Sequence, residues 1–486
     1  MGQMAIVTAA GNVNKPIFLK IRSAKSFIIF VVTFAVSTDI FMYGLLVPVT
    51  PTALEAKLNI SENKIQSWTS ILLALYSAAF LVFSPLFGYL ADHVRSRKWP
   101  LLLGLVVLGM ATALLCIGTH ITLWVVGRLL QGAAVAMVWT VGLALLVDTV
   151  GEDELGQAIG YVSMGLNIGV LSGPLVGGVV SEHAGYYAVW TVAFGLIGID
   201  FVLRLAMIEK KDAAQWLVPD GVASQPLERR GDGTTGCSIS STIARSTEVP
   251  LTQSNLASNQ QSFKQFIMLL SSPRLLISLW GTFLVSLVLT SFDSVLPLYV
   301  EETFGWQQTA QGLIFIALVV PHLVDPLVGS LVDRLPNAAR FLISGAFVSA
   351  ITPAILLRLV DTYSMNDKVI LCALLAVIGL CLAIANTPLM LETFFAVKEK
   401  ESALPGRLDT TRGGAVAFAF GLSNMAFAAG SVVGPFFAGY IRQRAGWDTF
   451  AWAMGLIVGV SSVPAVLWTG GWIMERRNQV VPEAHP

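Results

Sequence analysis

Three ionisable side chains lie inside apolar segments of this chain, where a charge is costly. Asp39 lies in the first such segment, Arg128 in the fourth, and Asp293 in the seventh, four residues before Pro297. Burial disfavours the charged form of a carboxylate, so Asp39 can carry a proton or meet a cationic substrate. Arg128 must face a cavity, meet a partner or clamp backbone carbonyls. Asp293 lies nearer the end of its segment, where a solvated rim carboxylate fits equally well.

Other ionisable residues in apolar segments have a structural role or none that the sequence assigns. Asp200 and Arg204 are four residues apart, the spacing of an ion pair on one helix. His322 and Asp325 share a segment, and the sequence gives them no role. The four cysteines follow neither a disulfide framework nor a metal-ligand spacing. We expect no metal and no cofactor.

Long apolar runs must position these side chains. The chain has 486 residues, of which 55% are hydrophobic and 12% charged, against about 25% charged in a soluble domain. Runs of the length needed to cross a bilayer, about 20 residues, occur twelve times. They lie at about 27–50, 66–91, 100–118, 122–148, 156–181, 187–208, 275–300, 307–332, 340–360, 368–392, 414–440 and 448–474. The sequence therefore predicts an all-α membrane protein with twelve transmembrane helices.

A polar break divides the twelve runs into two sets of six. Most of the 30 lysines and arginines fall on the side of the membrane that also holds both termini, which the positive-inside rule assigns to the cytosol. The break is poor in apolar residues, so we expect a flexible linker there. The predicted organisation is a cytosolic tail at 1–26, a six-helix bundle at 27–208, a cytosolic linker at 209–274, a second bundle at 275–474 and a cytosolic tail at 475–486.

The two bundles repeat one glycine pattern at a constant offset along the sequence. Small residues on one helical face let a neighbouring backbone approach closely, and a proline removes a helical hydrogen bond. The first copy comprises Gly160, Gly169, Gly173, Pro174, Gly177 and Gly178. The second comprises Gly421, Gly430, Gly434, Pro435 and Gly439. Parallel repeats of this size are how two-halved transporters are built, so we expect two parallel-repeat bundles.

A second duplicated motif follows the second and eighth runs. The chain there resembles the major facilitator superfamily, whose short inner loop has the pattern G-x-L-a-D-r-x-G-r-k. The matching residues are Gly88, Asp92, Arg97 and Lys98 in the first half and Asp333 and Arg334 in the second. We expect a carboxylate and cations at these helix ends to form a charge latch that breaks as the halves rock.

Within that superfamily the chain resembles fungal twelve-span drug:proton antiporters related to the vesicular amine transporters. The segment around Arg128, Gly127-Arg128-Leu-Leu-Gln131-Gly132, is similar to the R-x-x-q-G motif, which implies a part for Arg128 in proton coupling. The glycine pattern of 160–178 resembles that of the antiporter branch. Asn386 and Asn424 stand where acids are expected for monoamine loading, so these amides are candidate substrate contacts instead.

We therefore predict a proton-coupled transporter, not an enzyme, that exports a small organic molecule such as a drug, toxin or secondary metabolite by alternating access. A proton symporter or a uniporter shares this fold, and a transporter-like membrane sensor is the alternative from another class. The expected partners are the substrate, protons and the lipid bilayer, with the protein monomeric in the plasma membrane, or in a vacuolar or vesicular membrane. The net charge of zero argues against nucleic acid.

Asn59-Ile60-Ser61 is a glycosylation sequon in the first predicted outer loop. If the predicted orientation is correct, an Asn59→Gln variant lacks the glycosidase-sensitive mass shift of the parent on an electrophoresis gel. Labelling of a cysteine at position 59 from the cytosolic face alone contradicts the orientation.

Overall fold

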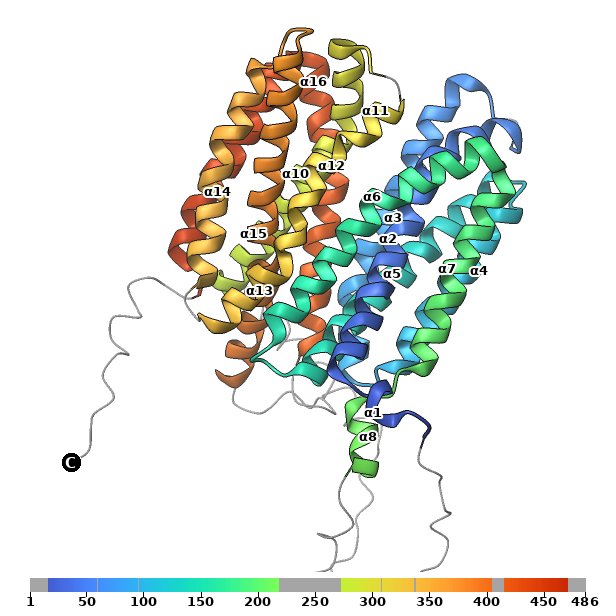
Figure 1. The fold of residues 1–486 in the computed structure, drawn as a ribbon, viewed down its shortest axis with the longest axis vertical. Helices are drawn as coiled ribbons and strands as arrows, with labels where there is room; N and C mark the ends of the chain where they lie inside the picture. The colour runs from blue at the N-terminus through green and yellow to red at the C-terminus, as the bar shows by residue number, and fades with distance from the viewer. Residues whose placement is uncertain are drawn as a thin grey trace, which may run out of the picture.

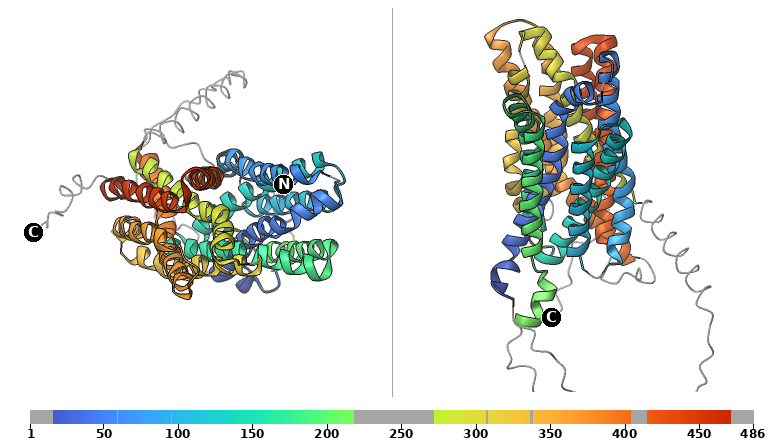
Figure 2. Two further views of the ribbon diagram at one scale, coloured as in Figure 1. Left: turned by 90° about the horizontal axis from the view of Figure 1, so that it is seen from above. Right: turned by 90° about the vertical axis from the view of Figure 1, so that its right-hand side faces the viewer.

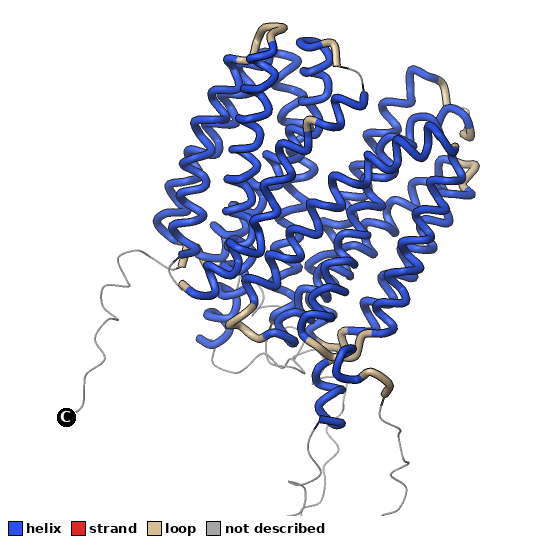
Figure 3. The backbone as a smooth tube through the Cα atoms, in the orientation of Figure 1, coloured by secondary structure: helices blue, strands red, loops and turns tan. Residues whose placement is uncertain are grey.

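The computed structural model describes residues 16–58, 60–94, 96–217, 272–306, 308–335, 338–403 and 415–470. Within these ranges the chain forms helices joined by short loops, with no strand (Figure 3). Backbone amides and carbonyls cannot bond to water inside a bilayer, so a helix that satisfies them internally is the structure that such apolar runs favour.

The first half of the chain forms one bundle of long helices. Its elements are α1 (Leu19–Arg22), α2 (Lys25–Ala56), α3 (Glu62–Asp92), α4 (Lys98–Ile117), α5 (Ile121–Val150), α6 (Leu155–Ala184) and α7 (Tyr186–Ala206). The short helix α8 (Lys210–Leu217) follows, at the start of the segment predicted to be a flexible linker.

The second half forms the other bundle. Its elements are α10 (Pro273–Phe304), α11 (Gln308–Leu313), α12 (Phe315–Val319), the 3-10 helix η1 (Val320–Val324), α13 (Asp325–Arg334), α14 (Ala338–Leu356), the 3-10 helix η2 (Leu357–Leu359), α15 (Met365–Ala403) and α16 (Val416–Trp468).

Eleven helical segments of the described residues are long and apolar enough to cross a membrane. The last, α16, contains two spans, because Gly446 interrupts it with a φ of 81° and a ψ of 177°. This confirms the prediction of twelve transmembrane helices.

The eighth span differs from the single helix that its apolar run predicts. It consists of α11, α12, η1 and α13 in succession. Pro321 and Pro326 both lie at this break, and each lacks the N–H that an unbroken helix requires. The two halves are therefore not identical here, since α3, the corresponding span of the first half, runs unbroken through Pro85.

The duplication extends to backbone conformation at the opposite end of the bundles. Gly185 has a φ of 82° and a ψ of 177°, almost the values of Gly446, its counterpart in the second half. The Tyr186 hydroxyl donates to the Leu115 carbonyl at 3.1 Å, and Trp447 Nε1 donates to the Leu357 carbonyl at 2.9 Å. Each half thus ties its last hairpin to its third span in the same way.

The bundles lie side by side (Figures 1 and 2). The helices α1 and α8 lie at one end, at the bottom of Figure 1. The charge count assigns this end to the cytosol, and we call it the inner end.

Three glycines of α6 bring it against the backbone of α2. A Cβ at Gly169 would lie 2.6 Å from the Ser37 carbonyl oxygen, and one at Gly177 would lie 2.5 Å from that of Leu45. Gly173, between them, meets the Phe41 carbonyl oxygen at 2.8 Å. In the second half Gly430 and Gly434 bring α16 against α10 in the same way. A Cβ at Gly178 or Gly439 would meet nothing within 4 Å. These two glycines belong to the repeated pattern but take no part in the close helix packing.

Candidate functional site

A cavity lies between the two bundles near the middle of the molecule. The space open to the centre of a water-sized sphere is about 20 Å³, little more than one water molecule needs, so the cavity is nearly closed in this conformation. The first half contributes Val36, Trp139, Leu143, Val162, Ser163 and Leu166, and the second half contributes Thr282, Asn386, Met390, Ser423, Asn424 and Phe427. None of these twelve side chains carries a charge, and the polar ones are hydroxyls, amides and one indole.

Both predicted amide residues lie at this cavity and bridge the halves. Asn386 Nδ2 donates to Ser163 Oγ at 3.4 Å, and Asn424 Nδ2 donates to Thr140 Oγ1 at 3.3 Å. Trp139 packs against Phe427 of the other half with ring centroids 6.2 Å apart, and its buried Nε1 has no hydrogen-bond partner among the described residues. Trp139 thus lines the cavity with an indole whose N–H is unsatisfied among the described residues.

Arg128 is fully buried inside the first bundle. Its Nη1 donates to Gln131 Oε1 at 3.3 Å, while Nε and Nη2 have no partner in the described ranges of the chain. The guanidinium carbon lies 5.9 Å from the ring centre of Tyr43, and the Tyr43 ring lies 4.7 Å from that of Tyr76. The Arg128 guanidinium therefore lies near the Tyr43 ring. The structural alternative required hydrogen bonds to backbone carbonyls, and Arg128 makes none within the described part of the chain.

Asp39 is also buried in the first bundle, with 1% of its surface exposed. Neither carboxylate oxygen has a hydrogen-bond partner in the described part of the chain. A buried carboxylate without partners is costly and is rare in proteins. A group held in this way is able to bind a proton, which removes the uncompensated charge.

The other predicted ionisable residues are placed differently. Asp293 is exposed, which fits both a solvated rim carboxylate and a coupling or substrate residue, so its role stays a prediction. Asp200 and Arg204 are fully buried and form an ion pair of 2.5 Å, and Arg204 Nη1 also donates to the Leu101 carbonyl. The predicted helix ion pair is therefore present.

Two carboxylates close the inner end by bonding to helix N-termini of the opposite half. Asp92, the last residue of α3, accepts hydrogen bonds from the backbone N–H of Ala417 and Phe418, both at 2.9 Å. Asp333, near the end of α13, accepts them from Gly156 at 2.7 Å and from Gln157 at 2.8 Å. Ala417 and Phe418 match Gly156 and Gln157 at the offset of the glycine repeat, the offset that relates Gly421 to Gly160. The two contacts are therefore copies of each other, related by the duplication.

Glycines let the backbones meet beside these carboxylates. A Cβ at Gly88 would lie 2.7 Å from the Ala417 carbonyl oxygen, and one at Gly421 would lie 2.6 Å from that of Ser84. In the other contact, a Cβ at Gly160 would lie 2.4 Å from the Asp325 carbonyl oxygen. The first glycine of each repeated pattern therefore packs against the opposite half, whereas the later ones, apart from Gly178 and Gly439, pack within their own half.

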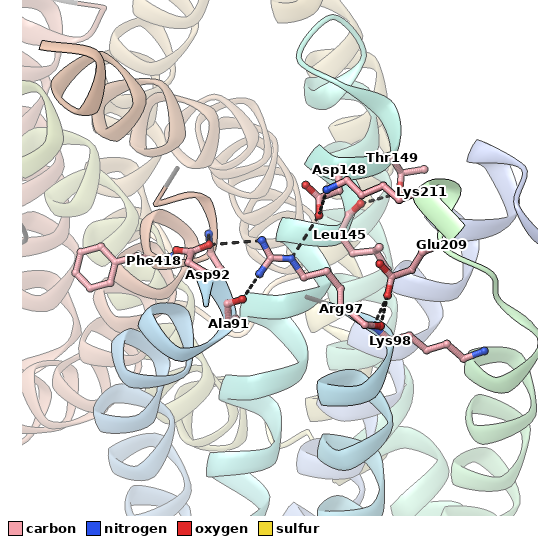
Figure 4. A network of polar contacts seen from close by, with 12 residues as sticks. Ala91, Asp92, Arg97, Lys98, Leu145, Asp148, Thr149, Glu209, Lys211 and Phe418 are labelled. Carbon is pink, nitrogen blue, oxygen red and sulfur yellow. Dashed lines mark hydrogen bonds and ion pairs between the residues drawn. The ribbon is translucent and has the colours of Figure 1, made fainter. Parts of the chain in front are cut away.

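Arg97 organises the inner end of the first bundle (Figure 4). Its guanidinium lies 3.5 Å from Asp92 and 3.4 Å from Asp148, and it donates to the Ala91 carbonyl. Lys98 instead donates to the carbonyls of Leu205 and Met207, in its own half. Of the predicted latch residues, Asp92 and Asp333 make the contacts between the halves, whereas Arg97 and Lys98 contact groups of their own half. Their action as a latch stays a prediction. Arg334 is exposed.

The sequence does not identify the donors of these contacts. Gly156, Gln157, Ala417 and Phe418 act through backbone N–H groups, which carry no residue-type signal. The constant offset of the duplication is the signal that relates them, once one of the two contacts is known. Asn59 lies outside the described residues.

Removing the charge of both closing carboxylates is expected to open the inner end. Hydrogen bonds to a charged group contribute about 1.5–3 kcal/mol each, so the Asp92→Asn/Asp333→Asn double variant should shift the closed-to-open ratio by at least tenfold. Spin labels at the exposed positions Val94 and Leu335, in a background without the four native cysteines, report the distance between the halves by double electron–electron resonance. Asp212→Asn, which removes an exposed charge from α8, is the control. Equal distance distributions in the double variant and the control contradict the closing role.

Comparison with known proteins places this architecture. The family model of the Major Facilitator Superfamily matches residues 29–404. An uncharacterized MFS-type transporter of Schizosaccharomyces pombe is 30% identical over 92% of this chain and 97% of its own length. The class B tetracycline resistance protein of Escherichia coli is 28% identical over a shorter match, 30% of this chain and 34% of that protein. The crystal structure of the human organic anion transporter MFSD10 covers 91% of this chain and 99% of that one, with a TM-score of 0.61 and 15% identity.

Proposed function

Because the chain belongs to the major facilitator superfamily, and is therefore a membrane transporter and not an enzyme, we propose that it exports a small organic molecule in exchange for protons. The two bundles rock about the central cavity, which opens alternately to each side. The proposed location is the plasma membrane, where the protein acts as a monomer.

The observation that carries proton coupling is the pair of unsatisfied ionisable groups in the first bundle. Both oxygens of Asp39 and two nitrogens of Arg128 are buried without hydrogen-bond partners among the described residues. A structural ion pair, such as Asp200–Arg204, satisfies its groups in one fixed arrangement. Groups left unsatisfied in one conformation are suited to gain a proton or a partner in another. We assign the transported proton to Asp39.

Alternating access is supported by where the halves are joined. The hydrogen bonds of Asp92 and Asp333 join them at the inner end, and those of Asn386 and Asn424 join them at the cavity. The carboxylate contacts end on backbone N–H groups at helix starts, which water can satisfy when the halves separate. Closing and opening of the inner end therefore exchange hydrogen bonds without leaving charges buried.

The cavity chemistry supports an uncharged, partly aromatic cargo. Its lining offers apolar and aromatic surface from Trp139 and Phe427, with hydroxyls and amides for hydrogen bonds. No lining side chain can neutralise a permanent charge, and an unpaired charge is costly in such a site. The buried N–H of Trp139 selects a hydrogen-bond acceptor on the cargo.

A symporter, a uniporter and a membrane sensor could all have this fold, and experiments distinguish them from an antiporter. A symporter or uniporter differs only in the direction or absence of coupling. The repeated glycine pattern, which resembles that of antiporters, favours exchange. A membrane sensor needs no turnover, so net transport of any compound by the purified protein excludes it as the sole function.

Uptake into proteoliposomes with an imposed pH gradient tests the proposal. We expect a panel of uncharged aromatic compounds to accumulate when the lumen is acidic, and accumulation to collapse when an ionophore removes the gradient. Uptake that ignores the gradient and stops at equal concentrations indicates a uniporter, and accumulation driven only by an alkaline lumen indicates a symporter.

A further inference from the structure

His322 and Asp325 form a buried pair that the transport mechanism above does not use. His322 Nδ1 lies 3.4 Å from Asp325 Oδ2, and the two residues are 1% and 0% exposed. His322 Nε2 and Asp325 Oδ1 have no partner among the described residues. An imidazole and a carboxylate so placed can hold one proton between them and remain neutral as a pair.

The pair occupies the break in the eighth span. His322 lies in η1, and Asp325 is the first residue of α13, whose other end carries the closing carboxylate Asp333. The backbone of Asp325 lies against α6, where a Cβ at Gly160 would be 2.4 Å from its carbonyl oxygen. The segment that bears the pair is thus the segment that closes the inner end against the first half.

The first half has no such pair at the matching positions. When Asp333 is aligned with Asp92, His322 corresponds to Leu81 and Asp325 to Ser84. Ser84 donates to the Phe80 carbonyl within the unbroken helix α3, yet it meets Gly421 as Asp325 meets Gly160. The contact between halves therefore needs no ionisable group at this position, yet the second half carries one.

The other ionisable residues on the elements that contact η1 and α13 lie away from His322 and Asp325. These elements are α6, α12, α13, α14 and α15. The one ionisable residue of α14 is Arg340, whose Nε donates to the Thr469 carbonyl. On α6 the ionisable residue beside Gly160 is Tyr161, which is 38% exposed, and α12 has none. Asp333 and Arg334 lie at the far end of α13. In α15 the run of 368–392 carries Lys368, Cys372, Cys381 and Glu392. Lys368 lies over the Tyr363 ring, and Glu392 pairs with Arg274. Among the described residues, His322 is the ionisable side chain that contacts Asp325.

We propose that His322 and Asp325 form a second proton-binding site, separate from Asp39, that controls closure of the inner end by the eighth span. The inference rests on the proposed alternating access and adds a site to it. With one proton the pair is neutral and stays buried while α13 packs on α6. Loss of that proton leaves one uncompensated negative charge in an apolar interface, so α13 separates from α6 and admits water. The closed state thus binds the proton more tightly than the open state.

The sign of the pH response follows from linkage. Because the closed state holds the extra proton, its population is largest at low pH and falls as the pH rises. Release of one proton limits this change in the closed-to-open ratio to about tenfold per pH unit. A merely structural pair, with the same protonation in both states, gives no such slope.

The test measures the distance between spin labels at Val94 and Leu335 across a pH range from about 5.5 to 8, which brackets the ordinary pKa of histidine. We expect the parent to lose the short-distance population as the pH rises. The His322→Leu/Asp325→Ser double variant copies Leu81 and Ser84 of the first half, which pack in the equivalent contact, and should not lose the short-distance population as the pH rises. Asp325→Asn alone should behave in the same way. Burial raises the pKa of Asp92 to about 6, so protonation of that closing carboxylate can open the inner end only at the acidic limit, which is a response of the opposite sign.

Three results overturn the proposal. A parent distance distribution that is independent of pH does so whatever the variants show. A pH response of the parent's sign retained in the double variant removes the role of the pair. A response lost in Asp39→Asn but kept in the double variant transfers the site to Asp39. The distance measurement needs no substrate, so a failure of gradient-driven uptake counts against the proposed function alone and leaves the pH response of the closure interpretable.

Discussion

Replacement of Asp39 by asparagine is expected to abolish gradient-driven accumulation in proteoliposomes, down to the level of protein-free vesicles. The variant keeps the shape of the side chain but cannot lose or gain a proton at neutral pH. Exchange of labelled for unlabelled substrate across the membrane needs no net proton movement, so it should persist. The measurement is uptake with and without an acidic lumen, paired with substrate exchange at equal pH on both sides.

Two variants make this result interpretable. Asp39→Glu keeps an ionisable group and should restore part of the coupled uptake. Asp212→Asn removes an exposed charge on α8 and should behave as the parent does. Coupled uptake that survives in Asp39→Asn moves the transported proton to another group, of which Asp293 and Arg128 are the next to test.

Leucine at Gly173 or at Gly434 is expected to destabilise the folded protein strongly. A Cβ at Gly173 would lie 2.8 Å from the Phe41 carbonyl oxygen, and one at Gly434 would lie 2.7 Å from that of Leu287. Overpacking costs roughly 1–3 kcal/mol and more where the neighbour is backbone, which cannot change rotamer. The yield of monodisperse protein in detergent and its Tm should both fall.

The same helices supply matched controls with the opposite expected sign. Gly178 and Gly439 meet nothing within 4 Å, so leucine fits at both positions. Leucine also favours the helix over glycine by roughly 0.5–1 kcal/mol. Gly178→Leu and Gly439→Leu should therefore retain or raise the Tm. Equal loss in all four variants would show that lipid contact, and not helix–helix packing, constrains these glycines.

The spans and their duplication follow from the sequence because both depend on residue type over long segments. Apolar runs of bilayer length predict every membrane-spanning segment, and the constant offset of the glycine pattern predicts the repeated packing of Gly173 and Gly434. The break in the eighth span does not follow, since Pro321 and Pro326 lie within one continuous apolar run. Pro85 and Pro174 lie inside unbroken helices, so a proline alone does not predict a break.

The sequence predicts which residues belong to the candidate site, but not what surrounds them. Asp39, Arg128, Asn386 and Asn424 can be predicted because polar groups stand out within apolar spans. Their surroundings depend on which helix face meets which neighbour, and the sequence does not specify that. The motif position of Lys98 predicts a place in the latch, yet its amine binds carbonyls at the end of α7 and beyond in its own half.

The inner contacts of Asp92 and Asp333 are two copies of one arrangement, in which each half offers a carboxylate and accepts one in return. A single six-helix unit carries both sides of that arrangement on one surface. Two identical units facing each other about a two-fold axis would satisfy it twice, which is the defining property of an isologous dimer. The full chain therefore contains, within one polypeptide, the kind of interface that a homodimer has. Because the two units are parts of one chain, their sequences can differ. The His322–Asp325 pair, present in one unit only, is a difference that no symmetric dimer can have.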